Sequence, residues 1–356
     1  MSHAEAQQSY IEACAKLAGR DVSPALRLFG RAESLGWSAD ECAAGRWDCF
    51  MLLGDFECAW RESDSIASRG APDPHRLWDG LTFTGRHVML RCLHGLGDTI
   101  QFIRYSPLIR AEARRLVVEV PARMMSLVAR VDGVDEVISW EVPRSHEPHW
   151  DQHIEIMEVP RAFRTTCDSI PNRRPYLDVS RTTSDSARNR WKIQGGSKVG
   201  LVWASSAWDH SRSLPMEKLV PVLRKPGFSF FSLQAGPEQS QLVHLPPGCN
   251  CRDLVDDSIT PLETAAQISN LDLVITVDTM VAHLAGALGK PVWLMLNFAS
   301  DWRWMLHRAD SAWYPSMTIF RQPRQGDWDS VMRQIDAALD EFPSRRREMD
   351  SVTLEA

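Results

Sequence analysis

Two series of alternating strand and helix patterns constrain the fold of this 356-residue chain most strongly. The first series begins with the apolar run His87–Cys92, passes a glycine turn at 95–97 and continues with helical periodicity over Thr99–Ala113. The second begins with the apolar strand Lys198–Ala204 and includes the strand Val292–Leu296. Strands that alternate with helices form parallel β-α-β units, so the sequence predicts two α/β domains in tandem.

The remaining elements of the two series follow the same alternation. Further strands are predicted at Leu116–Val120, Val134–Trp140, Phe228–Gln234 and Leu271–Val277, and further helices at Ala122–Val131, Met216–Leu223, Leu262–Ser269, Thr279–Leu288 and Trp328–Leu339. Residues 141–180 are rich in proline and are predicted to be irregular.

Residues 1–70 have the periodicity of helices instead, with apolar side chains three and four residues apart. The segment Asp21–Ala25 returns in altered form as Asp55–Ala59, 34 residues later. That offset is the period of a tetratricopeptide helix pair. A stable array needs about three such repeats, so we expect these two copies to lean on the rest of the protein. An unrelated group of four helices is the alternative interpretation.

The composition is that of a soluble globular protein, because 44% of the residues are hydrophobic and 24% are charged. The net charge of −6 argues against a protein that coats nucleic acid, since that role needs a broad basic surface. The apolar runs have the length of strands and are too short to span a bilayer. The first ten residues lack the pattern of a signal peptide. We therefore expect a cytoplasmic protein without a transmembrane segment.

The eight cysteines are scattered and include no C-x-x-C pair, which favours reduced and mostly buried thiols. Cys249 and Cys251 form one C-x-C pair, and a metal site there is the alternative. A second ligand pair at zinc-site spacing is missing, so the sequence predicts no metal.

The first candidate site is the turn His94–Thr99, which follows a strand and opens a helix. Gly95 and Gly97 permit close approach to the backbone, and the first turn of a helix attracts anions. Asp98 is either a cap of this helix or a catalytic carboxylate. The third glycine of a dinucleotide fingerprint is missing, which disfavours a nicotinamide-dependent oxidoreductase.

The second candidate site lies where another strand ends and a helix begins. Asp278 and Thr279 occupy this junction, and Thr279 with the following N–H groups could hold a phosphate. His283 follows one helical turn later on the same face. An ordinary capped and buried helix is the alternative.

Two further candidate sites also follow strands. The loop 204–215 offers the Ser205 hydroxyl and the Arg212 guanidinium, which suits a bidentate grip on phosphate unless it is only a solvated loop arginine. The turn Gln234–Glu238 offers a carboxylate for ribose hydroxyls, or is a solvated turn. Carboxyl ends of parallel strands gather ligands, so we expect all four sites around one interdomain cleft.

These segments resemble bacterial glycosyltransferases of family 9, the heptosyltransferase-like enzymes, in a tetratricopeptide-fused form. The resemblance covers roughly residues 45–330 and rests on GLGDTIQFIRYSPL (Gly95–Leu108), PYL (Pro175–Leu177), KVGLVWA (Lys198–Ala204), RSLP (Arg212–Pro215), FSLQ (Phe231–Gln234), DTMVAHLAGALGKPVW (Asp278–Trp293) and DWRWMLHRADSAWYPSMTIFRQ (Asp301–Gln322). Position 94 departs from the family, because His94 stands where Gln or Glu is usual.

The resemblance implies the α/β GT-B fold, with two facing Rossmann-like domains behind a small all-α helical region. The implied divisions are a tetratricopeptide-like region at 1–70, a linker at 71–84, an acceptor-side domain at 85–182, a nucleotide-sugar domain at 183–340 and a polar tail at 341–356.

The resemblance also implies an activity, which is metal-independent and inverting transfer of a sugar from a nucleoside-diphosphate sugar to a hydroxyl, without a cofactor. Asp98 matches the general base. The nucleotide-sugar site would comprise Gly95, Gly97, Ser205, Arg212, Gln234, Glu238, Asp278, Thr279 and His283, with the diphosphate near Arg212 and the ribose near Glu238.

The acceptor is expected to be a glycan or a protein, with residues 1–70 as a binding region for a protein partner. The resemblance adds peripheral attachment to the inner membrane as an alternative to a purely cytoplasmic location. A catalytically inactive GT-B scaffold and a nucleotide-sugar epimerase are the competing functions, although the turn Gly95–Thr99 has few of the charged residues that an epimerase needs.

Overall fold

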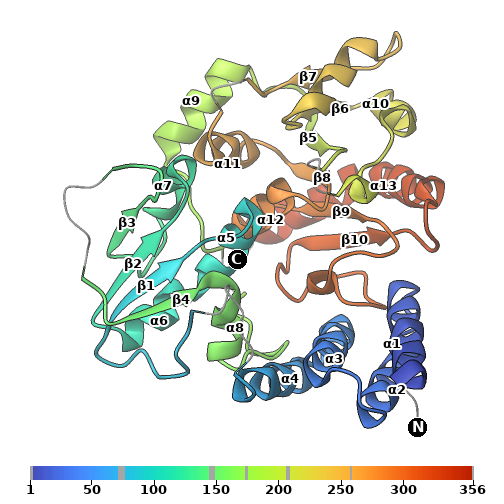
Figure 1. Ribbon diagram of the computed structural model, residues 1–356. Coiled ribbons are helices and arrows are strands. Elements are labelled where there is room, and N and C mark those ends of the chain that lie inside the picture. The colour runs from blue at the N-terminus through green and yellow to red at the C-terminus, as the bar shows by residue number, and fades with distance from the viewer. Residues whose placement is uncertain are drawn as a thin grey trace.

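The computed structural model describes residues 3–70, 77–143, 149–172, 175–205, 209–256 and 259–354. It consists of a helical block and two α/β domains, which lie side by side with the helical block against both (Figure 1). The described part of the chain includes no helix long and apolar enough to cross a membrane.

The helical block consists of two consecutive helix pairs. Its helices are α1 (His3–Ala18), α2 (Val22–Ser34), α3 (Ala39–Leu53) and α4 (Phe56–Ser68). Ala25 and Ala59, the small residues of the repeated pattern, are both fully buried. The four helices expected from the sequence are therefore present, whereas their relation to tetratricopeptide repeats stays a prediction.

The first α/β domain has a parallel four-stranded sheet in the order β3-β2-β1-β4. Its strands are β1 (His87–Arg91), β2 (Arg115–Glu119), β3 (Glu136–Ile138) and β4 (Gln152–Glu155). Its helices and 3-10 turns are α5 (Leu96–Phe102), η1 (Ile103–Tyr105), α6 (Ser106–Glu112), η2 (Ala122–Met124), α7 (Met125–Val128), η3 (Ile156–Glu158) and α8 (Val159–Ala162).

Two predictions for this domain were wrong in detail. Strand β4 lies in the stretch 141–180 that the sequence predicts to be irregular. Its signal is weak because Gln152–Glu155 is short and only Ile154 among its four residues is apolar. The single helix predicted over Thr99–Ala113 is two helices separated by the 3-10 turn η1, and the first begins earlier, at Leu96.

The second α/β domain has a parallel six-stranded sheet in the order β10-β9-β8-β5-β6-β7. Its strands are β5 (Ser197–Val202), β6 (Phe228–Ser232), β7 (Cys251–Asp253), β8 (Leu273–Val277), β9 (Val292–Leu296) and β10 (Met317–Arg321). Its helices and turns are α9 (Arg181–Trp191), η4 (His210–Arg212), η5 (Met216–Leu219), α10 (Val220–Leu223), η6 (Pro237–His244), α11 (Pro261–Ser269), α12 (Met280–Ala287), η7 (Trp302–Trp304) and α13 (Trp328–Leu354). Helix α13 continues beyond Leu339, so the segment predicted as a tail is helical to Leu354.

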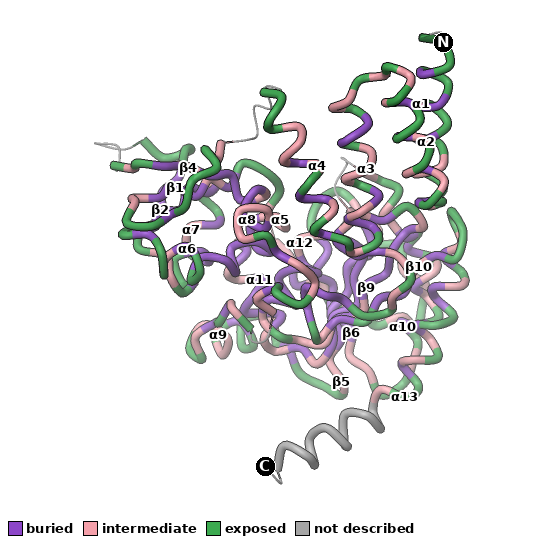
Figure 2. Tube along the Cα trace, turned by 90° about the horizontal axis from the view of Figure 1, so that it is seen from below, coloured by how far each residue is buried: buried purple, intermediate pink, exposed green. Residues whose placement is uncertain are grey.

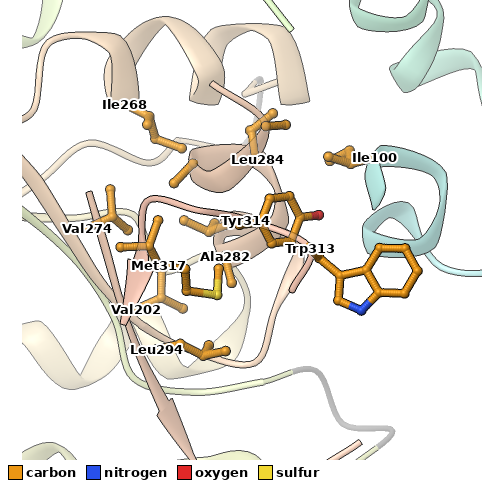
Figure 3. Packing of buried hydrophobic residues seen from close by; sticks show 14 of the residues in the cluster. Ile100, Val202, Ile268, Val274, Ala282, Leu284, Leu294, Trp313, Tyr314 and Met317 are labelled. Carbon is orange, nitrogen blue, oxygen red and sulfur yellow. The ribbon is translucent and has the colours of Figure 1, made fainter. Parts of the chain in front are cut away.

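The core runs continuously from one domain into the other. One cluster of buried residues includes residues from both sheets, from the helices that cover them and from the seam between the domains (Figure 2). At that seam, Ile100 of α5 lies opposite Leu284 of α12, and Trp313 belongs to the same buried cluster (Figure 3). Helices α5 and α12 are in direct contact, which brings the turn at Gly95 next to the end of β8.

Candidate active site

The Asp98 carboxylate lies in the first turn of α5 and has a fixed donor on each oxygen. Its Oδ2 accepts a hydrogen bond of 2.9 Å from the Gly95 backbone N–H. Its Oδ1 accepts an ion-paired hydrogen bond from the Arg303 guanidinium, which comes from the second domain. Asp98 is therefore a helix cap and also contacts the second domain, while its role as a catalytic carboxylate stays a prediction.

Arg303 makes hydrogen bonds to residues of both domains. Its Nε donates to the Gln101 side chain at 2.8 Å and its Nη1 to Asp301 at 2.9 Å. Burial alone would lower the pKa of the Arg303 guanidinium, but the charges of Asp301 and Asp98 raise that pKa above its ordinary value. Arg303 is therefore a permanent cation beside Asp98.

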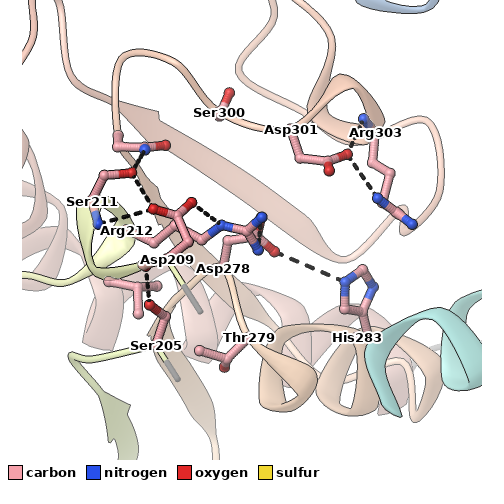
Figure 4. A network of polar contacts seen from close by, with 12 residues as sticks. Ser205, Asp209, Ser211, Arg212, Asp278, Thr279, His283, Ser300, Asp301 and Arg303 are labelled. Carbon is pink, nitrogen blue, oxygen red and sulfur yellow. Dashed lines mark hydrogen bonds and ion pairs between the residues drawn. The ribbon is translucent and has the colours of Figure 1, made fainter. Parts of the chain in front are cut away.

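Asp278 and Arg212 form a second ion pair close by (Figure 4). Arg212 Nη1 lies 3.3 Å from Asp278 Oδ2, and its Nε donates to Asp209 at 2.9 Å. Burial raises the pKa of Asp278 to about 6, although Arg212 opposes this shift. Asp278 consequently changes charge near neutral pH.

His283 lies beside the second ion pair and against Gly97 of the first domain. Its Nδ1 is 2.9 Å from the Tyr314 hydroxyl, and its Nε2 is 3.9 Å from Asp278. Burial, with the positive charges of Arg303 and Arg104, lowers the pKa of His283 well below its ordinary value, so the ring is neutral. Gly97 gives this ring its space, because a Cβ there would lie 2.9 Å from the ring carbon Cδ2.

The remaining phosphate candidates lie at the carboxyl ends of β5 and β8. Thr279 precedes α12 and makes no side-chain cap bond, so it leaves the first N–H groups of that helix uncapped by its side chain. The Ser205 hydroxyl donates to the Asp209 carbonyl, and the Ser205 N–H donates to Ser213. Positions 206–208 of the same predicted loop lie outside the described residues.

Gln234 and Glu238 occupy different surroundings. The buried Gln234 amide accepts from the Trp203 and Ala204 N–H groups and donates to Ala204 and Ala235 carbonyls, so it orders the end of β5. A groove of about 580 Å³ opens beside β6 and β7, and its lining includes Gly236, Gln239, Val243, Cys251 and Asp253.

Sequence reasoning missed Asp253 in this groove. Glu238 is half-buried beside the groove but does not line it, whereas Asp253 does. Asp253 Oδ2 accepts a hydrogen bond of 2.6 Å from Gln239, and Oδ1 accepts from the Val255 N–H. The sequence does not predict its position at the carboxyl end of a strand, because β7 is only three residues long.

Arg303 was also missed as an individual residue. It belongs to the DWRW segment of the resemblance, but no strand-to-helix turn marks that segment as a site. Arg303 and Asp98 are 205 residues apart in the chain, so only the tertiary structure brings them together.

One cluster of possible metal ligands occurs among the residues that the structure describes. It comprises His87, His149 and Asp151, at the amino ends of β1 and β4 and hence at the opposite edge of the sheet from Asp98. The Cys249 and Cys251 pair is not part of any such cluster in this region, and burial raises the pKa of the Cys251 thiol to about 12. A protonated thiol is a poor metal ligand.

Solved structures share this arrangement of two α/β domains. A glycosyl transferase family 9 protein from Veillonella parvula matches 73% of this chain and 97% of its own length, with a TM-score of 0.56 and 12% identity. The E. coli ADP-heptose LPS heptosyltransferase II matches 72% of this chain and 99% of its own length, with a TM-score of 0.55 and 14% identity.

The chain has the fold of these family 9 glycosyltransferases. The predicted GT-B architecture with two Rossmann-like domains is therefore confirmed. In this glycosyltransferase fold, the Asp98–Arg303 pair joins the two domains, and both residues of the Arg212–Asp278 pair belong to the second domain. Fold alone does not determine a reaction, which has to be argued from the side chains.

The sequence comparisons add one relative. No protein-family profile matches the chain. Protein FlbA of Caulobacter vibrioides is 28% identical in an alignment 369 positions long, which covers 90% of this chain. The chain spans 58% of the length of that curated relative.

Proposed function

We propose that the protein is an inverting, metal-independent glycosyltransferase that moves a sugar from a nucleoside-diphosphate sugar to a hydroxyl of a glycan or protein acceptor. One observation supports this proposal: the Asp98 carboxylate of the first domain is paired across the domain seam with Arg303, and the second domain places the Arg212–Asp278 pair and His283 beside the same seam. The fold shared with glycosyltransferases supports it.

In the proposed reaction, Asp98 accepts the proton of the acceptor hydroxyl as its oxygen attacks the anomeric carbon. The bond from that carbon to the diphosphate oxygen breaks as the new glycosidic bond forms on the opposite face. The leaving diphosphate takes the electron pair, and the proton stays on Asp98.

The leaving diphosphate needs cations or oriented dipoles when no metal is used. Arg212 supplies a guanidinium, and the N–H groups at the start of α12 supply partial positive charge beside Thr279. Asp209 and Asp278 hold Arg212 in place before a ligand arrives. An anionic ligand would favour the protonated form of Asp278, so its arrival would be linked to proton uptake.

The test is calorimetric titration of the full chain with ADP, UDP and GDP, and with ADP-heptose, UDP-N-acetylglucosamine and GDP-mannose, with Mg²⁺ and with EDTA. We expect one nucleotide to bind in both conditions and the Arg212→Ala variant to lose at least tenfold in affinity. Arg333→Ala, which removes an exposed arginine on α13, is the matched control. Binding of no nucleotide by the folded protein would refute the proposal and favour an inactive scaffold.

A further inference from the structure

We propose that Arg303 is a positioning residue for Asp98. We also propose that, through the segment 300–306, the position of this carboxylate depends on how the helical block packs against the second domain. The inference rests on the proposed function for the role of Asp98, but the contact itself can be tested without any activity. It assigns to the helical block a part in setting the active site, in addition to any part in binding a partner.

The Asp98 carboxylate cannot turn without losing a bond. Arg303 binds one oxygen and the Gly95 N–H binds the other, so the plane of the carboxylate is fixed by two donors from different domains. The Asp98 side chain retains 23% exposure, which leaves its remaining lone pairs open to an acceptor hydroxyl.

The Arg303 guanidinium is itself held rigidly. Gln101 and Asp301 take two more of its N–H groups, and its guanidinium carbon lies 4.8 Å from the centre of the Trp302 ring and 5.6 Å from that of Phe102. The planar fork of arginine satisfies three partners at once, which the single ammonium of lysine cannot do in the same geometry.

The segment that carries Arg303 is attached to the helical block on both sides. The Arg20 side chain donates to the Ser300 carbonyl at 2.6 Å, and the Leu306 N–H donates to the Leu52 carbonyl at 2.8 Å. Between them, Trp302 packs edge-to-face on Trp47 of α3, with ring centres 5.5 Å apart. A displacement of α3 therefore moves the segment on which Arg303 sits.

The test compares two buried arginines of the same seam. Arg303→Gln removes the contact with Asp98, whereas Arg104→Gln removes bonds to the Gln101 and Trp313 carbonyls and to the Tyr176 hydroxyl, and leaves Asp98 paired. We measure hydrogen exchange at residues 95–102 and hydrolysis of whichever nucleotide sugar of the panel the wild type binds, with water as the acceptor.

We expect Arg303→Gln to speed exchange at residues 95–99 at least tenfold and to lower kcat about 10- to 100-fold, with the donor KM within twofold of wild type. Arg303→Lys should recover part of the kcat, while Arg104→Gln should change neither quantity beyond a general loss of stability. Equal effects of the two glutamine variants, or unchanged exchange in Arg303→Gln, would show that Arg303 only joins the domains.

The link to the helical block has its own pair of variants. Trp47→Ala should speed exchange at residues 95–99 and 300–306, whereas Trp37→Ala, which removes a tryptophan packed on Tyr10 inside the block, should not. If Trp47→Ala leaves hydrogen exchange at residues 95–99 unchanged, the proposed link between the helical block and Asp98 is overturned. A wild type that hydrolyses no donor would instead refute the proposed function, and the exchange data would still decide whether Arg303 orders Asp98.

Discussion

At the scale of single residues, Asp98 is the group whose chemistry is easiest to isolate. Asp98→Asn preserves the shape and one of the two acceptor oxygens, so it keeps the bond from either Arg303 or the Gly95 N–H, and it cannot take a proton from a hydroxyl. We expect kcat for transfer or donor hydrolysis to fall about 10²- to 10⁴-fold, while calorimetry shows nucleotide affinity within twofold of wild type. A variant that retains full kcat would remove Asp98 as the base.

Asp278 gives the site a dependence on pH that can be read from stability. Its pKa is raised to about 6 when folded, against an ordinary 3.8, because the buried carboxylate is poorly solvated. The stability that this group contributes is therefore complete below about pH 3.8 and is lost as pH rises through 6.

We expect the Asp278→Asn variant to lack this loss. Relative to the variant, wild type should lose on the order of 2–3 kcal/mol of unfolding free energy between pH 4 and pH 7.5. Denaturant unfolding at four pH values measures the difference. Parallel stability curves for the two proteins would contradict the assignment.

At the scale of elements, the tight contact between α5 and α12 depends on a missing side chain. A Cβ at position 97 would lie 2.9 Å from the His283 ring, which Trp304 stacks on and Tyr314 binds. The ring cannot move away, so Gly97→Ala should lower the unfolding free energy by about 1–3 kcal/mol. Gly30→Ala in α2 meets nothing within 4 Å and should raise it by about 0.5–1 kcal/mol. Thermal unfolding of both variants checks the pair.

The same scale shows how far the sequence could lead. Strands such as β5 and β8 are continuous apolar runs, because helices cover both faces of their sheet, and they were predicted correctly. Strand β4 has only four residues with polar ones among them, and no such signal marks it. Asp98 and His283 follow visible strand-to-helix turns, whereas Arg303 lies on the irregular turn η7 and reaches Asp98 only through the tertiary fold.

At the scale of the whole molecule, the helical block is part of the folded unit. The Trp60 indole N–H donates to the Thr165 carbonyl of the first domain at 2.7 Å, and Phe56 stacks on Trp313 of the second with ring centres 6.0 Å apart. Met51, Phe56, Ala59 and Trp60 also belong to the same buried cluster as the cores of both domains. The second helix pair therefore leans on both domains as expected, whereas the first pair belongs to a separate buried cluster, against which Trp302 and Leu306 of the second domain pack.

Removal of residues 1–70 should consequently expose the apolar seam and destabilise both domains. We expect the full chain to unfold in one calorimetric transition and the truncated chain to aggregate or to lose that transition.

The Trp60→Ala variant weakens the same contact without removing the block. It should lower the free energy of unfolding by about 3–5 kcal/mol, because it leaves a cavity and an unpaired Thr165 carbonyl. Trp37→Ala is the control, because the Trp37 indole stacks on Tyr10 within the block. It measures the effect of weaker packing inside the block when the contact with the two domains is intact. Two separate transitions in the full chain, with the first unaffected by Trp60→Ala, would mean that the block is an independent module, and its influence on Asp98 would then have to be abandoned.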